Sequence, residues 1–194
     1  MPTSAANVAP IVDQDRAIGT VAAAFLSDPI ARWVFRDAHQ YLTYFPQLVP
    51  VFAGGAFDSG TAHSVEAFSG VALWLPPGVK SDDEAMGALT EEAVPASEHT
   101  EVFAFLDQMG EYHPTERHWY LPLIGVDPVR QGRGYGSALL AHGLKACDAQ
   151  AIPAYLEATS ERNKRLYERH GFEEIGVIQS GSSPPMWPML RKPC

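Results

Sequence analysis

Three glycines, Gly132, Gly134 and Gly136, stand at alternate positions between an apolar segment and a segment with helical apolar spacing. Glycine lets a chain turn sharply and brings backbone N–H groups close to a ligand. The N-terminus of a helix adds partial positive charge, so a strand, a glycine loop and a helix together form a site for an anion such as phosphate. The spacing therefore predicts a phosphate-binding loop.

Two common phosphate loops do not fit this spacing. A P-loop needs Gly, four residues and then Gly-Lys-Ser/Thr, but from Gly132 the second glycine would fall on Ser137. A dinucleotide-binding Gly-x-Gly-x-x-Gly loop fails at the same position, although Glu157 lies at about the distance of the ribose-binding acid of that fold. Only about 60 residues follow the loop, too few for the usual strand order of that fold.

Periodicity and turn residues indicate the elements that must position the loop. Helices are expected over 13–26 and 30–52, twice within 81–116, after the glycines, and over 160–170. Strands are expected over 63–68, 71–75, 118–126, 154–159, 172–179 and 187–190. The order strand, helix, strand, helix, strand favours a partly parallel sheet, and we predict one α/β domain over residues 1–194.

The apolar run at 118–126 is typical of a strand that is buried on both sides. Pro122 interrupts this run, and a proline cannot donate a hydrogen bond to a neighbouring strand. We therefore expect a bulge near Pro122, or a separation of this strand from one of its neighbours.

Composition excludes several classes of protein. The hydrophobic content of 46% with 19% charged residues is that of an ordinary globular chain, and the net charge of −9 argues against a nucleic-acid partner. The apolar patch at 21–26 is too short to span a membrane, and no leader pattern precedes it, so a cytoplasmic protein is expected. Two cysteines give no support for a disulfide framework or a cysteine metal site.

The negative charge is concentrated at 81–116, which holds ten acids and no Lys or Arg. One interpretation is that these acids wall an acceptor site and attract a cationic amine. The other is that they form the solvated side of two helices.

The motif Gln131-x-x-Gly134-x-Gly136 resembles the pyrophosphate loop of the GNAT superfamily of acetyl-CoA-dependent N-acyltransferases. The segment ATSERNKRLYERHGF at 158–172, with Asn163 four residues before Tyr167, resembles a second signature of that superfamily. The stretches AAAFLSDP, VALWLPPG and MLRKP are similar to the branch that contains puromycin N-acetyltransferase. The acidic segment matches that branch least, so the acceptor is not inferred from the resemblance.

The resemblance implies a GNAT-like α/β single domain with a mixed, partly parallel twisted sheet flanked by helices on both faces. It implies acetyl-CoA as co-substrate and no metal, with the pantetheine arm in a gap between the fourth and fifth strands. Arginines of the loop either neutralise the outer phosphate or are solvated. The implied donor-binding residues are Ile124, Val126, Gln131, Gly132, Arg133, Gly134, Gly136, Ser137 and Asn163.

The resemblance also implies a general acid at Tyr167. A phenol suits this role because its ordinary pKa near 10 allows it to return a proton to a departing thiolate. The alternative is a core tyrosine that packs on Phe172. For the general base, which must take a proton from the amine, Glu157 is the first candidate; Glu66, His118 and Tyr120 are weaker ones.

The expected function is transfer of an acetyl group from acetyl-CoA to a primary amine by direct attack in a ternary complex. The expected acceptor is a small molecule, such as an aminonucleoside or a polyamine-like compound, and the expected assembly is a monomer or homodimer. Two alternatives stay open: a protein or peptide N-acetyltransferase, and a non-catalytic CoA-binding module.

Overall fold

Aspartate caps begin the helices in the first quarter of the chain. The structure is a computed structural model that describes residues 6–194. The caps are Asp13, Asp28 and Asp37, whose carboxylates accept hydrogen bonds from backbone N–H groups of the first turn. The helices that follow are α1 (Gln14–Phe25), α2 (Pro29–Val34) and α3 (Ala38–Ala53), and a short α4 (Gly55–Asp58) comes next.

The prediction of one helix over 30–52 is therefore wrong. The chain leaves helical geometry at Phe35, and Asp37 then caps a second helix by accepting from the Gln40 amide at 2.8 Å. The cap satisfies a free amide of the first turn of α3, so a new helix starts directly after the short connection that follows α2.

Seven strands form one sheet with the order β1-β2-β3-β4-β5-β7-β6. All neighbouring strands are antiparallel except β4 and β5. The strands are β1 (Val8–Pro10), β2 (Ala62–Val65), β3 (Gly70–Leu75), β4 (Trp119–Val126), β5 (Ala154–Ala158), β6 (Glu173–Glu174) and β7 (Trp187–Arg191). The remaining helices are α5 (Asp83–Ala93), α6 (His99–Tyr112), α7 (Tyr135–Gln150) and α8 (Glu161–Glu168).

The expected irregularity at Pro122 is confirmed on both sides of β4. Against β3 the register shifts between Leu73 and Leu75, opposite the stretch of β4 that holds the proline. Against β5 the pairs Trp119–Ala154 and Tyr120–Tyr155 form before the two strands part. The strand edge beyond Tyr120 thus separates from β5 in the middle of the sheet.

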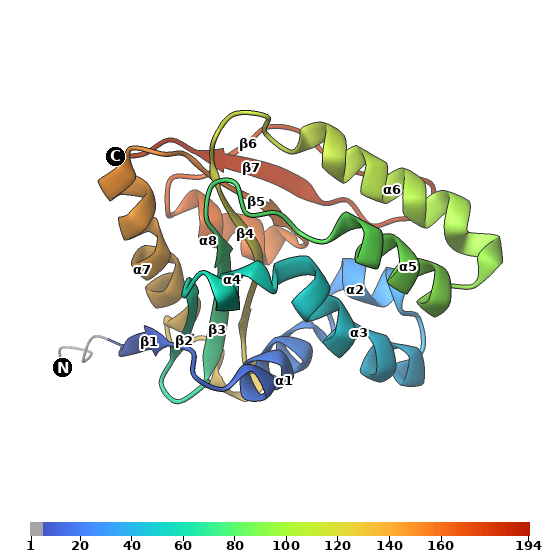
Figure 1. The fold of residues 1–194 in the computed structure, drawn as a ribbon, viewed down its shortest axis with the longest axis horizontal. Helices are drawn as coiled ribbons and strands as arrows, with labels where there is room; N and C mark the ends of the chain where they lie inside the picture. Colours follow the sequence, from blue (N-terminus) through green and yellow to red (C-terminus); the bar gives the residue numbers. More distant parts are fainter. Residues whose placement is uncertain (1–5) are drawn as a thin grey trace.

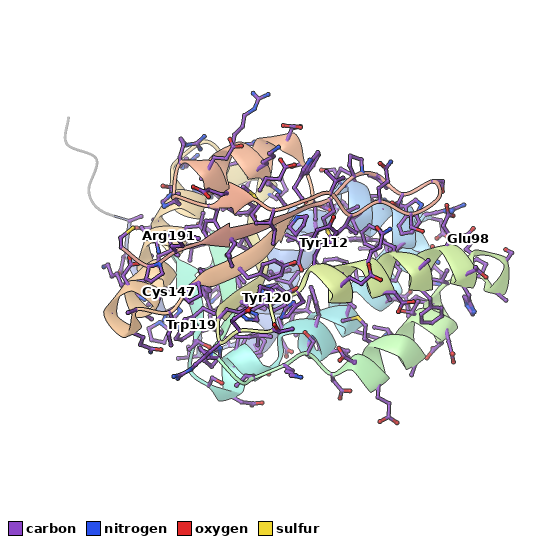
Figure 2. All side chains as sticks on the ribbon, turned by 90° about the horizontal axis from the view of Figure 1, so that it is seen from above. Glu98, Tyr112, Trp119, Tyr120, Cys147 and Arg191 are labelled. Carbon is purple, nitrogen blue, oxygen red and sulfur yellow. The ribbon has the colours of Figure 1, made fainter. Side chains whose placement is uncertain are left out.

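Helices cover both faces of the sheet (Figure 1). On one face, α1, α3 and α4 pack on side chains such as Leu73 and Tyr120. On the other face, α7 and α8 pack on residues such as Trp74 and Leu156. Figure 2 shows side chains filling the space between the layers, with Trp119 and Tyr120 among them. The predicted mixed α/β single domain, partly parallel and flanked on both faces, is confirmed.

The predicted strand over 172–179 is mostly absent as a regular element. Only Glu173–Glu174 pair with β7, and Ile178 forms an isolated bridge to Met186. Ile175 N still donates to the Pro188 carbonyl at 2.9 Å, but Pro188 has no N–H to return. Proline in the partner strand therefore interrupts the ladder. Within residues 6–194, no helix has the length and apolar character needed to cross a membrane.

Candidate active site

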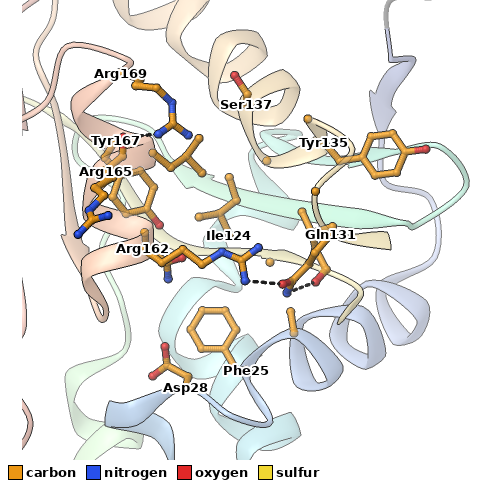
Figure 3. Close-up of a pocket in the computed structure, with 18 of the residues that line it drawn as sticks. Phe25, Asp28, Ile124, Gln131, Tyr135, Ser137, Arg162, Arg165, Tyr167 and Arg169 are labelled. Carbon is orange, nitrogen blue, oxygen red and sulfur yellow. Dashed lines mark hydrogen bonds between the residues drawn. The ribbon is translucent and has the colours of Figure 1, made fainter. Parts of the chain in front are cut away.

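A cavity of about 710 Å³ lies where β4 and β5 separate, between the glycine loop, α8 and the end of α1 (Figure 3). Its walls hold eight of the nine predicted donor-binding residues, and Arg133 is the exception. Tyr167 also lines it, whereas Glu157 does not. The eight are Ile124, Val126, Gln131, Gly132, Gly134, Gly136, Ser137 and Asn163.

The loop needs glycine for its backbone at two positions. Gly132 and Gly134 have φ of +76° and +81°, and a Cβ at either would meet no atom within 4 Å. The left-handed backbone rather than crowding therefore demands glycine there. At Gly136 the demand is different, because a Cβ would lie 3.3 Å from Leu166 Cδ2 of α8. Gly136 thus allows α7 and α8 to approach each other.

Residues at the start of α7 that have free backbone amides line this cavity. Gly134 is the N-cap of α7, and Ala138 N donates to its carbonyl at 3.0 Å. The amides of Tyr135, Gly136 and Ser137 lie in the first turn, where no earlier carbonyl of the helix is in reach. All three residues line the cavity, and the first turn of α7 has no acidic side chain. This arrangement suits a diphosphate.

Replacement of Gly134 by alanine is expected to raise the KM for acetyl-CoA about tenfold or more. An L-residue with left-handed φ costs about 1–2 kcal/mol, so the loop either strains or changes course and its amides turn away. Steady-state kinetics with acetyl-CoA varied at fixed amine measure this change. Gly19→Ala in α1 is the control, since Gly19 has no left-handed φ and open space around it. Equal KM values for the two variants would contradict the role of the loop.

Three arginines on α8 or directly after it also line the cavity and were not predicted from the sequence. Arg162, Arg165 and Arg169 are exposed residues spaced three and four apart, so they share one side of the helix. Figure 3 shows the side chain of Arg162 reaching across to Gln131, with Arg165 and Arg169 on the far side of the cavity from Tyr135. Arg133, predicted to bind the donor, is exposed and lies outside this lining. The spacing of arginines in the second signature is the sequence signal that points to α8.

Arg162 ties α8 to the loop. Its Nη1 donates to Gln131 Oε1 at 3.0 Å, and Gln131 Nε2 donates to the Val126 carbonyl at 3.2 Å (Figure 3). Ser137 is held in a second way, because its Oγ lies 2.7 Å from His170 Nε2. These contacts join β4, the loop and α8 around one space.

Tyr167 both packs and faces the cavity. It is 5% exposed, and its ring lies edge-on to Phe172 with centroids 6.1 Å apart. The ring also lines the cavity, so the packing and catalytic interpretations are compatible. Burial raises the pKa of the Tyr167 hydroxyl, and the carboxylates of Asp28 and Glu157 raise it further. The phenol is therefore protonated at neutral pH and can act as a proton donor.

Glu157 lies at a second, adjoining cavity of about 130 Å³. Its Oε2 accepts a hydrogen bond from the Tyr120 hydroxyl at 2.9 Å. Its Oε1 is shielded from solvent and has no hydrogen-bond partner among residues 6–194. Burial raises the pKa of Glu157 to about 7, and the neighbouring hydroxyls of Tyr120 and Tyr155 oppose this rise. A carboxyl that titrates near neutral pH is suited to general-base catalysis.

Asp28 connects the two cavities and was not predicted as a site residue. Together with Phe25 it lines both of them. Its Oδ1 accepts from the amides of Ile30 and Ala31 at 3.0 and 3.1 Å, and its Oδ2 accepts from the Thr159 hydroxyl. Burial raises the pKa of Asp28 despite these hydrogen bonds. Its sequence signals were a helix-cap position, which many surface aspartates share, and its place in the stretch AAAFLSDP.

The weaker candidates for the general base lie elsewhere. Glu66 accepts from the Asn7 amide at 3.0 Å beside the β2–β3 turn. His118 Nε2 lies 3.0 Å from His113 Nε2, and Tyr120 donates to Glu157. Neither cavity is lined by any of these three residues. Among residues 6–194, no three His, Cys, Asp or Glu side chains gather closely enough to hold a metal ion.

The acidic segment contributes apolar side chains to the second cavity. Met86 and Leu89 of α5, and Leu106 and Met109 of α6, line it. None of the ten acids of 81–116 lines either cavity. Residues 81–116 therefore contribute apolar side chains to the cavity wall, and their acidic side chains lie outside both cavities.

Comparison with known proteins matches this geometry. Residues 96–174 match the model of the acetyltransferase (GNAT) domain. An uncharacterized N-acetyltransferase of Schizosaccharomyces pombe is 24% identical over 93% of this chain and 80% of its own length. A mycothiol acetyltransferase of Mycobacterium avium is 36% identical, over 38% of this chain but only 28% of its own length. A crystal structure from Corynebacterium glutamicum, described as histone acetyltransferase HPA2 and related acetyltransferase, superposes with a TM-score of 0.68 at 25% identity over 98% of both chains.

Proposed function

We propose that this acyltransferase, whose residues 96–174 match the acetyltransferase (GNAT) domain, transfers an acetyl group from acetyl-CoA to a primary amine of a small molecule. Similarity to named acetyltransferases favours catalysis over the alternative of a non-catalytic CoA-binding module. The observation that carries the proposal is one continuous space that joins the glycine loop, Tyr167 and Asp28.

The first cavity suits the donor in size and charge. Free amides at the start of α7 face it from one side and three guanidinium groups of α8 face it from the other. Backbone N–H groups and arginines are the groups that proteins use to bind phosphates. The strand edge at Ile124 and Val126, which has parted from β5, offers backbone groups to the amides of the pantetheine arm.

The second cavity suits the acceptor, and the carboxyls at its border suit the proton transfers. In the proposed reaction Glu157 takes a proton from the amine, and the amine nitrogen then attacks the thioester carbonyl. As the C–N bond forms and the C–S bond breaks, Tyr167 gives its proton to the thiolate. The remaining surplus proton of the nitrogen passes to the Tyr167 phenolate as the amide forms, and Glu157 releases its proton to solvent. Direct transfer needs no nucleophilic side chain.

Removal of arginines from α8 is expected to weaken donor binding. Arg165→Gln and Arg169→Gln should each raise the KM for acetyl-CoA about five- to tenfold, more than Arg133→Gln does, because only the α8 residues line the cavity. The effect should shrink as salt is raised, since salt screens exposed charges. The measurement is KM at low and high ionic strength, and the exposed Arg117→Gln is the control. A larger effect at Arg133 would instead place the phosphates on the outer side of the loop.

A protein or peptide acceptor is the second candidate, because the Corynebacterium glutamicum structure is described as a histone acetyltransferase and related acetyltransferase. Release of CoA thiol, measured across small amines, antibiotics and lysine-bearing peptides, distinguishes the two. Mass spectrometry should find a gain of one acetyl unit on a small amine. Turnover of peptides alone would favour the second candidate.

The other features of the proposal rest on sequence. The stretches AAAFLSDP, VALWLPPG and MLRKP are similar to the branch containing puromycin N-acetyltransferase, and we propose that the chain is related to this branch. We further propose that residues 1–194 act as one catalytic domain in the cytoplasm, as a monomer or homodimer. Acetyl-CoA is the proposed co-substrate, without a metal.

A further inference from the structure

We propose that the acceptor is a primary amine carried on a compact apolar group, which binds in the second cavity with its nitrogen between Glu157 and Asp28. This inference rests on the proposed function and narrows it. It replaces the wider class of polyamine-like and nucleoside amines by one defined by the walls of the cavity.

The walls are apolar on every side away from the two carboxyls. The cavity lies among α2, α3, α5 and α6, and its only charged lining residues are Asp28 and Glu157. Its volume of about 130 Å³ is close to that of a cavity that holds benzene, about 150 Å³. The space therefore fits a short alkyl chain or one aromatic ring. Its apolar lining includes Phe45, Leu48, Phe52, Met86, Leu106 and Met109.

The polar end of the cavity is prepared for a hydrogen-bond donor. Glu157 Oε2 accepts from Tyr120, whereas Oε1 accepts no hydrogen bond within 3.5 Å among residues 6–194, and the buried Tyr155 hydroxyl is the donor close enough to lower the pKa of this carboxyl. A buried acceptor without a partner is costly unless a ligand supplies the donor. An ammonium or amine N–H group is such a donor. Once bound there, the nitrogen lies beside Asp28, at the border with the donor cavity.

The same geometry disfavours other amines. A diamine bound by one end would place its second ammonium among apolar side chains, where a charge without a partner is strongly unfavourable. A peptide would have to bring its backbone N–H and C=O groups into a space that is filled by about one aromatic ring. The fixed position of the two carboxyls thus selects for an amine with one polar end.

A matched panel of amines tests this inference. The panel contains hexylamine, 2-phenylethylamine, 1,6-diaminohexane and a lysine-bearing peptide, with CoA thiol release as the readout. Hexylamine and 1,6-diaminohexane have the same chain and differ only by the second amine. We expect kcat/KM for hexylamine and 2-phenylethylamine to exceed that for the diamine and the peptide by about 100-fold or more.

Two tryptophan substitutions on one helix locate the binding site. Leu48→Trp fills the cavity and should raise the KM for hexylamine at least tenfold, with little change in the KM for acetyl-CoA. Leu42→Trp is the matched control, because Leu42 lies on the same helix α3 but is 63% exposed and outside the cavity. Thermal melting checks folding, and Met86→Trp repeats the test from α5 if Leu48→Trp does not fold.

The outcomes separate the inference from the proposed function. Equal or better turnover of the diamine or the peptide would overturn the apolar acceptor and leave the acetyltransferase intact. An unchanged hexylamine KM in folded Leu48→Trp and Met86→Trp would also overturn it. If calorimetry detects CoA binding but no amine of any class releases thiol, the proposed function itself fails.

Discussion

Replacement of Glu157 by glutamine is expected to lower kcat/KM for the amine by about 10²- to 10³-fold. Glutamine keeps the size of the side chain and its contact with Tyr120, but it cannot take a proton from the ammonium. Because Glu157 lies outside the donor cavity, the KM for acetyl-CoA should change little. Initial rates with amine and acetyl-CoA varied in turn separate the two effects.

The pH profile gives the same prediction a second readout. Burial raises the pKa of Glu157 to about 7, and a general base acts only in its ionised form. The wild-type kcat/KM should therefore rise with pH through about 7, and the glutamine variant should lack this step. The ionisation of the amine itself affects both enzymes alike. A variant that retains the step would exclude Glu157 as the base and would leave Asp28 as the next candidate.

Stability provides the control for folding. Since the pKa of Glu157 is raised from 4.5 to about 7 in the folded state, the folded state binds the proton more tightly than the unfolded state does. The free energy of unfolding therefore falls as pH rises from about 4.5 to 7, by about 3 kcal/mol from this group. Glu157→Gln should lack this fall. Denaturant unfolding at pH 5 and pH 8 measures it, and a variant that is stable but inactive at pH 8 separates chemistry from folding.

Replacement of Tyr167 by phenylalanine is expected to lower kcat by about 10²-fold or more, with little change in acetyl-CoA affinity. The ring would still pack on Phe172 and line the cavity, so only the proton donor is lost. The measurement is kcat together with the Kd for acetyl-CoA from calorimetry. Without the phenol, the thiolate must leave unprotonated, and so bond cleavage slows while donor binding persists.

Tyr44→Phe is the matched control for this change. Tyr44 is a partly exposed tyrosine of α3 whose hydroxyl lies 3.5 Å from Glu92, and it lines neither cavity. Its loss should leave kcat within about twofold of the wild type, in keeping with a surface substitution. An unchanged kcat in Tyr167→Phe would assign proton return to another group, such as water.

Features that depend on neighbouring residues were predictable from the sequence. The spacing of Gly132, Gly134 and Gly136 excluded two other loops, and the structure gives Gly132 and Gly134 the left-handed φ that glycine permits. Asn163 and Tyr167, four residues apart on α8, line one cavity as predicted. The effect of Pro122 was also predictable, because a missing N–H alters strand pairing wherever the strand lies. Each of these three features depends only on residues that are close together in the sequence, so it can be recognised without the fold.

The acceptor side of the site depended on contacts between distant segments. Asp28 reads in sequence as a helix cap, and only the fold places it against Thr159, 131 residues away, and at the border of both cavities. Likewise, the pKa of Glu157 is near 7 because the side chain is buried. That burial depends on segments far from β5 in the sequence. Arg162, Arg165 and Arg169 line the first cavity and Arg133 does not, because the fold decides which side of the glycine loop faces α8. The sequence by itself determined the glycine loop and the spacing that brings Asn163 and Tyr167 to one cavity. The tertiary structure decided the second cavity, because burial and cavity shape arise only when remote elements pack together.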